Sequence, residues 1–213
     1  MPDPLDWRYP EGRILVFAKA PLAGRVKTRL AAGIGGQEAA ALYARLMEET
    51  VCTSVQAALA PVTLCVDGAH PDFIALGERH DLAIVSQQGT DLGMRMYHAI
   101  RNALEQADFA VLIGTDCPLM SADYLAQACE SLRRGSEFVF GPAEDGGYVL
   151  VGARYAEPKL FSAMRWSTAH VMQQTRRRLR WLNRSCTELE TLWDLDTRED
   201  LERLHALYGS VKV

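Results

Sequence analysis

Four basic side chains gather in one short segment of the chain and offer chemistry that suits an anion. In the stretch VFAKAPLAGRVKTRLA these residues are Lys19, Arg25, Lys27 and Arg29. No Asp or Glu occurs between residues 12 and 37, so this window has a charge of +5, whereas the whole chain has −4 and the remainder −9. Arginine forms forked hydrogen bonds with phosphate oxygens, and lysine binds them as a point charge. The segment, which also contains Pro21 and Gly24, is therefore a candidate phosphate-binding loop.

The same segment can also be interpreted as a solvated surface loop. A binding role is favoured because the segment follows an apolar run, residues 13–18, which indicates a first strand. Parallel sheets bind ligands beyond the carboxyl ends of their strands. Gly24 would let the backbone approach such a ligand closely. The segment is not a Walker A loop, because Lys19 rather than glycine stands five residues before Gly24.

An aspartate follows the most apolar run of the chain. Asp116 stands in GTDCP, directly after FAVLI at residues 109–113. A carboxylate at the end of a strand can bind Mg²⁺, a hard ion that prefers one or two carboxylates together with phosphate oxygens and water. The alternative is a turn residue whose carboxylate accepts backbone N–H groups.

A second acidic segment, WDLDTREDL, lies near the end of the chain. Thr197 is a good helix N-cap, and acids in the first turn of a helix suit its dipole. Capping does not explain Asp194 and Asp196, which come before Thr197. If Asp196 reached Asp116 in space, the two carboxylates would form a clamp for a divalent cation.

A third acid occurs in a glycine-rich turn, GPAEDGGYVLVG, where Gly146 and Gly147 follow Asp145. Two consecutive glycines indicate unusual backbone angles or close contact with a ligand. The same residues between two apolar runs also predict a β-hairpin. Both interpretations can hold at once.

A weaker motif is RWST, in which Arg165 and Thr168 could hold a substrate anion. Trp166 within it is equally consistent with a core residue. The five histidines have no metal-ligand spacing, and no Ser-His-Asp set is indicated. The basic loop and the acidic clamp thus remain the main chemical features, and together they suit a nucleoside phosphate.

The elements that must position these residues follow from the apolar pattern. Strands are predicted at residues 13–18, 62–66, 83–86, 109–113, 137–140 and 148–151, and helices at 37–59, 93–107, 121–134, 168–182 and 198–208. Strands alternate with helices and the early strands are uniformly apolar, which is typical of a mainly parallel sheet covered on both faces. We expect a single-domain three-layer α/β/α sandwich with a mainly parallel mixed sheet over residues 13–213, preceded by an N-terminal extension, residues 1–12.

Composition excludes several other classes of protein. The pI of about 5.8 argues against general binding to nucleic acid or to an anionic membrane. The N-terminal residues do not resemble a secretory signal, and the apolar runs are too short to span a bilayer. The five scattered cysteines indicate free thiols in a reducing cytoplasm rather than disulfides or a zinc site. The oligomeric state is not evident from the sequence.

Taken together, five motifs resemble a known bacterial family. They are K-x-P-x-x-G-x-V-K-T-R-L (19–30), G-T-D-C-P (114–118), D-G-G-Y (145–148), W-S-T (166–168) and D-x-D-T-x-E-D-L (194–201). The family has the GT-A, nucleotide-diphospho-sugar transferase fold, and its members are often labelled glycosyltransferases. More distantly, the layout is similar to molybdenum-cofactor and phospholactate guanylyltransferases.

The resemblance implies roles for individual residues. Asp116 and Asp196 would bind Mg²⁺ or Mn²⁺, and Lys19, Pro21, Gly24, Arg25, Lys27 and Arg29 would bind the nucleotide phosphates. Lys27, Asp116 and Asp145 would be catalytic, and Asp145, Gly146, Gly147, Trp166 and Thr168 would bind substrate. The partners would be a nucleoside triphosphate or a nucleotide-sugar, together with a small acceptor.

One departure affects the expected reaction. GT-A glycosyltransferases commonly have D-x-D at the metal site, whereas GTDCP places Gly114 and Pro118 on either side of a single aspartate. We therefore expect transfer of a nucleotidyl group from a nucleoside triphosphate to a phosphorylated or hydroxyl acceptor. The alternatives are glycosyl transfer from a nucleotide-sugar and a non-catalytic nucleotide-binding protein.

Overall fold

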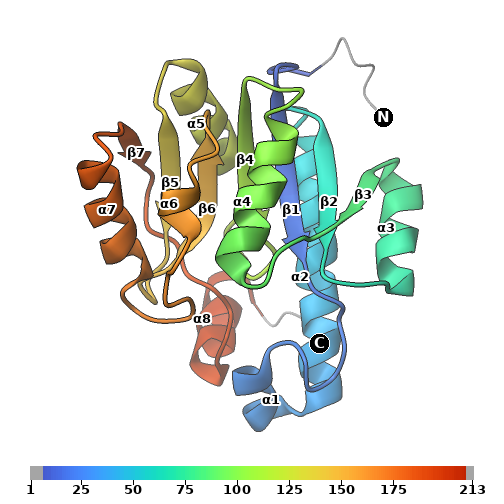
Figure 1. Ribbon diagram of the computed structural model, residues 1–213. Coiled ribbons are helices and arrows are strands. Elements are labelled where there is room, and N and C mark those ends of the chain that lie inside the picture. The colour runs from blue at the N-terminus through green and yellow to red at the C-terminus, as the bar shows by residue number, and fades with distance from the viewer. Residues whose placement is uncertain (1–6, 210–213) are drawn as a thin grey trace.

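A seven-stranded sheet forms the centre of the molecule. The computed structural model describes residues 7–209 (Figure 1). The strands are β1 (Gly12–Ala18), β2 (Val62–Val66), β3 (Ala83–Ser86), β4 (Phe109–Gly114), β5 (Phe138–Pro142), β6 (Tyr148–Ala153) and β7 (Cys186–Glu188). Their order is β3-β2-β1-β4-β6-β5-β7, and β6 alone runs antiparallel to its neighbours among these strands. The sheet is therefore mixed and mainly parallel, as predicted.

Helices cover both faces of this sheet. They are α1 (Thr28–Ile34), α2 (Gly36–Gln56), α3 (Pro71–His80), α4 (Leu92–Ala103), α5 (Ala122–Arg133), α6 (Pro158–Phe161), α7 (Val171–Trp181) and α8 (Arg198–Tyr208). Helices α2, α3 and α5 pack on one face, while α4, α6 and α7 pack on the other (Figure 1). This arrangement confirms the predicted three-layer α/β/α sandwich.

The uniform apolarity of the central strands follows from this double cover. In β1, Ile14 and Val16 face the α2 side, whereas Leu15 and Phe17 face the α4 side. Side chains alternate between the two faces of a strand, so both sets must be apolar when helices cover both faces.

A third and smaller core lies beyond the carboxyl ends of β1 and β4. It joins Leu30 of α1 to Leu42 and Leu46 of α2, and to Leu195 and neighbouring apolar residues from the end of the chain. Figure 1 shows α1 and α8 side by side at this end of the sheet. The first loop and the last segment of the chain are thereby held together.

Most predicted elements are confirmed, and the missed ones are short. The bounds of β2, β3 and α8 agree with the prediction. Helices α1, α3 and α6 and strand β7 were not predicted, because segments of three to ten residues leave a weak periodic signal. The Ser121 hydroxyl caps α5 by accepting a hydrogen bond from the Tyr124 N–H at 3.2 Å, as expected.

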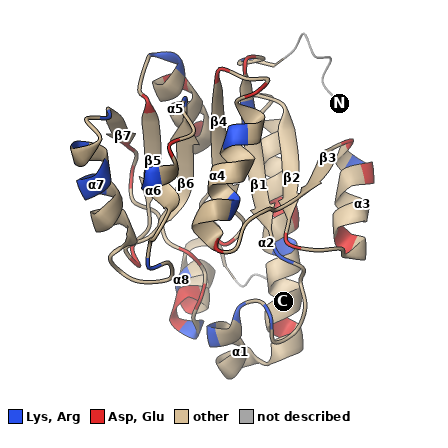
Figure 2. Cartoon of the chain, in the orientation of Figure 1, with Lys and Arg blue, Asp and Glu red and all other residues tan. Residues whose placement is uncertain are grey.

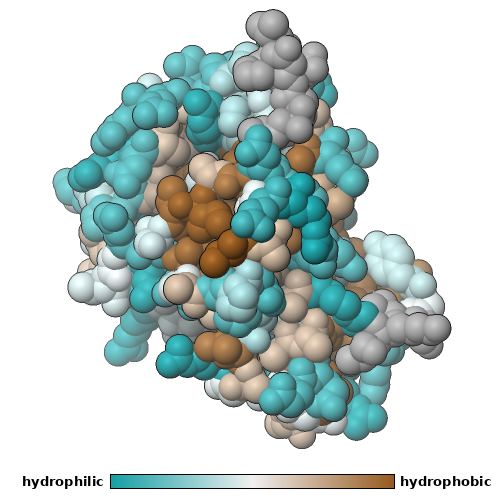
Figure 3. Space-filling view, turned by 90° about the vertical axis from the view of Figure 1, so that its right-hand side faces the viewer, coloured by the Kyte–Doolittle hydropathy of each residue, from teal (hydrophilic) through white to brown (hydrophobic). Residues whose placement is uncertain are grey.

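The prediction that helices cover the sheet completely was wrong at one edge, strand β3. All four residues of β3 are exposed, including Ile84 and Val85. Figure 3 looks onto the side of α3 and β3 and shows an apolar patch among hydrophilic residues. The strand is exposed because it is the edge of the sheet and α4 packs farther in, against β1 and β4.

The predicted extension, residues 1–12, lies partly outside the described residues. Within the described part, Tyr9 is buried, and its backbone N–H donates to the Leu59 carbonyl at 2.7 Å. The division into an extension and a domain stays a prediction. All five cysteines are free, as expected. Over residues 7–209, no helix combines the length and apolarity that crossing a membrane would need.

Candidate active site

A cavity of about 710 Å³ opens at the carboxyl ends of β1 and β4. Ten of the predicted site residues line it: Lys19, Arg25, Lys27, Arg29, Asp116, Asp145, Gly147, Trp166, Thr168 and Asp196. Figure 2 shows basic positions around the start of α1 and acidic positions on α8 at the same end of the sheet. Residues from the beginning, middle and end of the chain therefore meet in one cavity.

Three predicted residues do not line this cavity. Pro21 and Gly24 lie in the first loop, and Gly146 lies in the β5–β6 turn, but each is set back from the cavity wall. Gly24 has a φ of +79°, which favours glycine, and a Cβ atom there would meet no protein atom within 4 Å. Gly24 therefore shapes the turn beside open space, and its close approach to a ligand stays a prediction.

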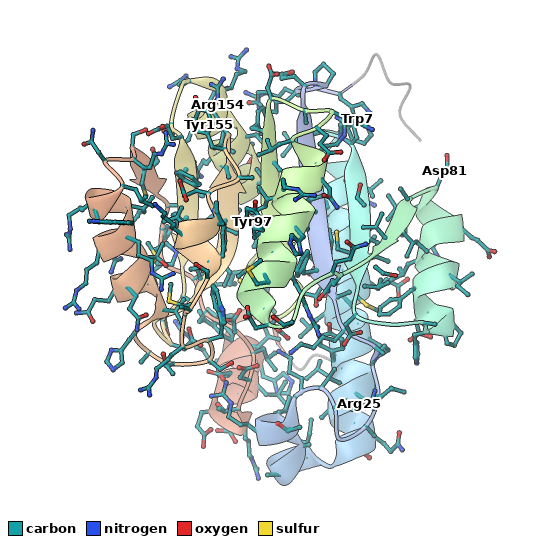
Figure 4. All side chains as sticks on the ribbon, viewed as in Figure 1. Trp7, Arg25, Asp81, Tyr97, Arg154 and Tyr155 are labelled. Atoms are coloured by element: carbon teal, nitrogen blue, oxygen red, sulfur yellow. The ribbon has the colours of Figure 1, made fainter. Side chains whose placement is uncertain are left out.

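The first loop is tied down at its start and exposes its middle. The Ala20 N–H donates to Oδ1 of Asp67 at 2.8 Å, so the loop begins on the end of β2. Arg25 is exposed on the loop before α1, where Figure 4 labels it. The backbone then turns inward at Lys27, whose φ of 48° and ψ of 41° are left-handed. This conformation is uncommon for a residue other than glycine.

Lys27 forms the electrostatic centre of the site. Its side chain is 1% exposed, and its Nζ forms ion pairs with Asp116 and, at 3.0 Å, with Oδ1 of Asp196. Burial by itself lowers the pKa of Lys27, but the two carboxylates outweigh burial and the pKa is raised. Arg29 adds a second ion pair to Asp196. Lys27 is therefore a permanent cation between two carboxylates.

The two carboxylates meet because the end of the chain packs along the loop after β4. The Leu195 N–H donates to the Asp116 carbonyl at 2.9 Å, and the Leu195 side chain is fully buried in the third core. Thr197 then caps α8 through a capping box with Asp200. The predicted cap is confirmed, and Asp196 is fixed just before it.

Asp194 belongs to the same cavity, although the sequence analysis gave it no role in the site. It alternates with the buried Trp193 and Leu195, so its side chain points away from the third core. Burial and the nearby charges of Asp116 and Asp196 raise the pKa of Asp194 to about 7. The D-L-D spacing was the signal that could have identified it.

Tyr43 of α2 is a second residue that sequence analysis missed. Its hydroxyl accepts a hydrogen bond from the Lys19 backbone N–H at 2.8 Å and bonds Oγ1 of Thr115 at 2.9 Å. It thereby connects the loop after β1 to the loop after β4. Burial raises the pKa of this phenol, so it stays neutral. In the sequence, Tyr43 is indistinguishable from the apolar positions of a helix.

The Asp145 turn is both a hairpin and a wall of the cavity. Strands β5 and β6 pair antiparallel, and Oδ1 of Asp145 accepts the Gly147 N–H at 2.8 Å. Gly146 has a φ of +87°, and a Cβ atom there would lie 2.2 Å from the Ala169 carbonyl oxygen. Its own carbonyl accepts the Met172 N–H at 2.8 Å. The glycine therefore serves packing of the segment before α7.

An aromatic wall faces the charged groups across the cavity. Trp166 and Tyr148 pack edge to face, with ring centroids 6.2 Å apart. Trp166 also packs against the apolar core between the sheet and helices α4, α6 and α7, so its core and cavity interpretations both hold. The Thr168 hydroxyl donates to the Arg165 carbonyl at 2.8 Å. Arg165 itself is exposed and does not line the cavity.

One observation indicates that Asp116 and Asp196 are suited to a divalent cation. Both carboxylates already bind the same positive charge, the Lys27 ammonium. Their side chains are 42% and 29% exposed, so water and phosphate oxygens could complete the coordination. Within residues 7–209, no group of three or more His, Cys, Asp or Glu side chains is placed to hold a metal ion.

The order of the strands and the position of the site define the class of fold. A basic loop after β1 and an aspartate after β4 lie at the carboxyl ends of a mainly parallel sheet. The chain belongs to the DUF2064 family, which is described as an uncharacterized protein conserved in bacteria. The model of that family matches residues 50–168. The basic loop lies before the matched segment.

Solved structures extend the similarity over nearly the whole chain. A provisionally named nucleotide-diphospho-sugar transferase from Desulfovibrio desulfuricans G20 has 32% sequence identity and a TM-score of 0.84, with 92% of this chain and 87% of that chain covered. This match confirms the predicted GT-A-like fold. Among curated proteins, no sequence match was found.

Two more distant structures share the fold. CMP:2-keto-3-deoxy-manno-octonic acid synthetase, solved with CTP, has 12% identity and a TM-score of 0.58 over 92% of this chain and 98% of that chain. Rv0371c from Mycobacterium tuberculosis H37Rv, solved with manganese, has 17% identity and a TM-score of 0.57 over 92% and 98%.

Proposed function

We propose that this protein is a Mg²⁺- or Mn²⁺-dependent transferase that moves a nucleotidyl group from a nucleoside triphosphate to a small phosphorylated or hydroxyl acceptor. The observation that supports this most is the convergence of Lys27 and Arg29 with Asp116 and Asp196 in one cavity. Fold-mates that were solved with CTP and with manganese support the same ligand classes.

In this reaction an acceptor oxygen attacks the α-phosphorus of the triphosphate. A new O–P bond forms, the bond from the α-phosphorus to the bridging oxygen breaks, and pyrophosphate leaves with that oxygen. Lys27, Arg25 and Arg29 neutralise the charge that develops on the leaving group. Asp116 and Asp196 would hold the divalent cation, which would supply further neutralisation of negative charge. No protein nucleophile is required.

The two substrates would bind in different halves of the cavity. The charged half, near the first loop, suits the phosphate chain. The half lined by Tyr148, Trp166 and Asp145 suits the acceptor, because aromatic faces and a carboxylate bind the rings and hydroxyls of small polar molecules.

The test is a thermal-shift panel of nucleoside mono-, di- and triphosphates and nucleotide-sugars, each with and without Mg²⁺ or Mn²⁺. Stabilisation by a triphosphate that requires the metal, followed by pyrophosphate release with an acceptor, supports nucleotidyl transfer. A response limited to a nucleotide-sugar, with slow hydrolysis of that compound, favours glycosyl transfer instead. Stabilisation without turnover with any acceptor indicates a non-catalytic nucleotide-binding protein.

Lys27 and Arg29 provide a second test of the phosphate half. Replacing both by alanine should weaken binding of a triphosphate more than binding of the corresponding nucleoside. Equal losses for the two ligands would indicate a collapsed loop rather than lost phosphate contacts.

A further inference from the structure

The Lys27 ammonium lies at the point where Asp116 and Asp196 converge. It contacts both carboxylates, and its side chain is 1% exposed although both acids are partly open to the cavity. A cation shared by the two carboxylates would have to lie close to this point. The ammonium and a divalent cation therefore compete for the same pair of ligands.

We propose that Lys27 is the resident counter-ion of the cation site, and that a divalent cation binds tightly between Asp116 and Asp196 only when Lys27 is drawn away by the phosphates of a nucleotide. This inference rests on the proposed function, because it describes how the same site is loaded. In this proposal the Lys27 ammonium moves from one partner, the two carboxylates, to another, the phosphate chain.

The balance of charge supports this order of binding. Lys27 and Arg29 already form ion pairs with Asp116 and Asp196. A divalent cation that enters alone adds two positive charges beside a buried ammonium, where repulsion is weakly screened. A triphosphate brings several negative charges and gives the ammonium a new partner. The cation and the nucleotide then bind with positive coupling.

The backbone of Lys27 is consistent with a residue that changes place. Its left-handed conformation, with a φ of 48°, is sparsely populated for lysine and costs free energy that the two ion pairs offset. Lys27 is also the N-cap of α1 and makes no side-chain capping bond. Its side chain can leave the carboxylates without removing a cap from the helix.

The first experiment is a titration with Mn²⁺ in the absence of nucleotide. Binding is measured by calorimetry or from the electron paramagnetic resonance signal of free Mn²⁺. The Lys27→Met variant, which removes the charge but keeps the length of the side chain, should bind Mn²⁺ on the order of ten-fold more tightly than the wild type. Arg29→Met is the matched control and should gain less, because Arg29 is exposed and contacts only Asp196 of the pair. Lys27→Met binding no more tightly than wild type would overturn the proposal.

A second measurement uses the unaltered protein, so a folding defect of the variant cannot obscure the result. Amine acetylation, read by mass spectrometry, should be slow at Lys27 and should accelerate several-fold when Mn²⁺ saturates the site. Lys159, which is exposed and lies over the Trp181 ring, reports the intrinsic rate and should not change. An unchanged rate at Lys27 while Mn²⁺ is bound would contradict the exchange.

These results are distinguishable from those that test the proposed function. Tighter Mn²⁺ binding by Lys27→Met, together with no nucleotide binding by the wild type, would support the competition between Lys27 and the cation for the two carboxylates and would reject the transferase. Metal-dependent nucleotide binding by the wild type, with no gain in Mn²⁺ affinity for Lys27→Met, would support the transferase and reject the competition.

Discussion

The two ends of the sheet use the same kinds of charged residue in opposite ways. At the amino-terminal end, Glu130 is bonded to the Tyr9 hydroxyl and to two arginines, and these partners lower its pKa to about 2. At the carboxyl end, burial and neighbouring acids raise the pKa of Asp194 to about 7. The first carboxylate is stabilised in its charged form, whereas the second is destabilised.

The difference shows which end serves stability and which serves binding. Glu137, also at the amino-terminal end, accepts from the Ser185 N–H and pairs with Arg184, and its pKa is lowered as well. At the other end, Asp194 shares an open cavity with Asp116, Asp145 and Asp196, and the raised pKa of Asp194 indicates that its charge is not fully compensated. Unfavourable electrostatics concentrated in a cavity are typical of a functional site.

The largest expected effect comes from removing a carboxylate of the cavity. Asp116→Asn should weaken metal-dependent nucleotide binding about 100-fold or more, because one of two protein ligands for the cation loses its charge. The fold should remain intact, since the side chain is 42% exposed. Calorimetry with Mn²⁺ and a triphosphate measures the loss.

Asp123→Asn is the matched control, because Asp123 is exposed on α5 and lies outside the cavity. Metal dependence that survives in Asp116→Asn would remove Asp116 from the site.

The next prediction compares two glycines with positive φ angles, one with a close neighbour and one beside open space. Gly146→Ala should lower the free energy of unfolding by about 2.5 kcal/mol, because a left-handed φ and contact with the Ala169 carbonyl act together. Gly135→Ala, at the amino-terminal end, has a φ of +109° and open space, so it should cost about 1–2 kcal/mol. Urea unfolding compares them, and equal losses would mean that the Ala169 contact is unimportant.

Two tyrosines allow the same substitution at both ends. Tyr43→Phe should cost about 1–2 kcal/mol of stability, because the Lys19 N–H and the Thr115 hydroxyl lose their partner. It should also weaken triphosphate binding roughly ten-fold, an effect of that same size. Tyr9→Phe, which removes the hydroxyl that donates to Glu130, should lower stability without changing nucleotide affinity. Comparable affinity losses in both variants would contradict a positioning role for Tyr43.

A smaller effect of opposite sign is expected at Asp194. Because its native pKa of about 7 exceeds the ordinary 3.8, ionised Asp194 destabilises the fold progressively as the pH rises from 3.8 to 7. Asp194→Asn should therefore raise the melting temperature by roughly 2–4 °C at pH ~8, equivalent to about 1 kcal/mol. The gain should shrink toward pH ~4. A variant that melts below the wild type at pH ~8 would show that the carboxylate is compensated.

The smallest effect is expected at Glu130. Its native pKa of about 2 lies below the ordinary 4.5, so its contribution to stability is present above pH 4.5 and is lost as the pH falls toward 2. Melting curves of Glu130→Gln and wild type should differ most near neutral pH and converge near pH ~2. A constant difference at every pH would exclude the ionised carboxylate as the cause.

Much of the fold could be predicted because the signals are local. The run FAVLI is buried throughout β4, and Thr197 caps α8 as its position before a helical pattern indicates. The short elements were missed because α6 and β7 contain four and three residues and are held by tertiary contacts. The exposure of β3 depends on where α4 packs, and the residues of the strand do not indicate that position.

The candidate site could be predicted in part for the same reason. Asp116 and the basic loop each follow a recognisable strand, whereas Tyr43 enters the site from the buried face of α2, whose other members are mostly apolar. The different reasons for the glycines, turn geometry at Gly24 and packing at Gly146, became visible only with their neighbours in place.

Local composition and periodicity were enough to predict the alternation of strands and helices, the positive charge after β1, and the acids after β4 and before α8. The packed fold was needed to show that Lys27 lies between Asp116 and Asp196, and that burial and neighbouring acids disfavour the ionised form of Asp194. These properties depend on distances between residues far apart in the chain, which the packing of Leu30 and Leu195 in one small core sets.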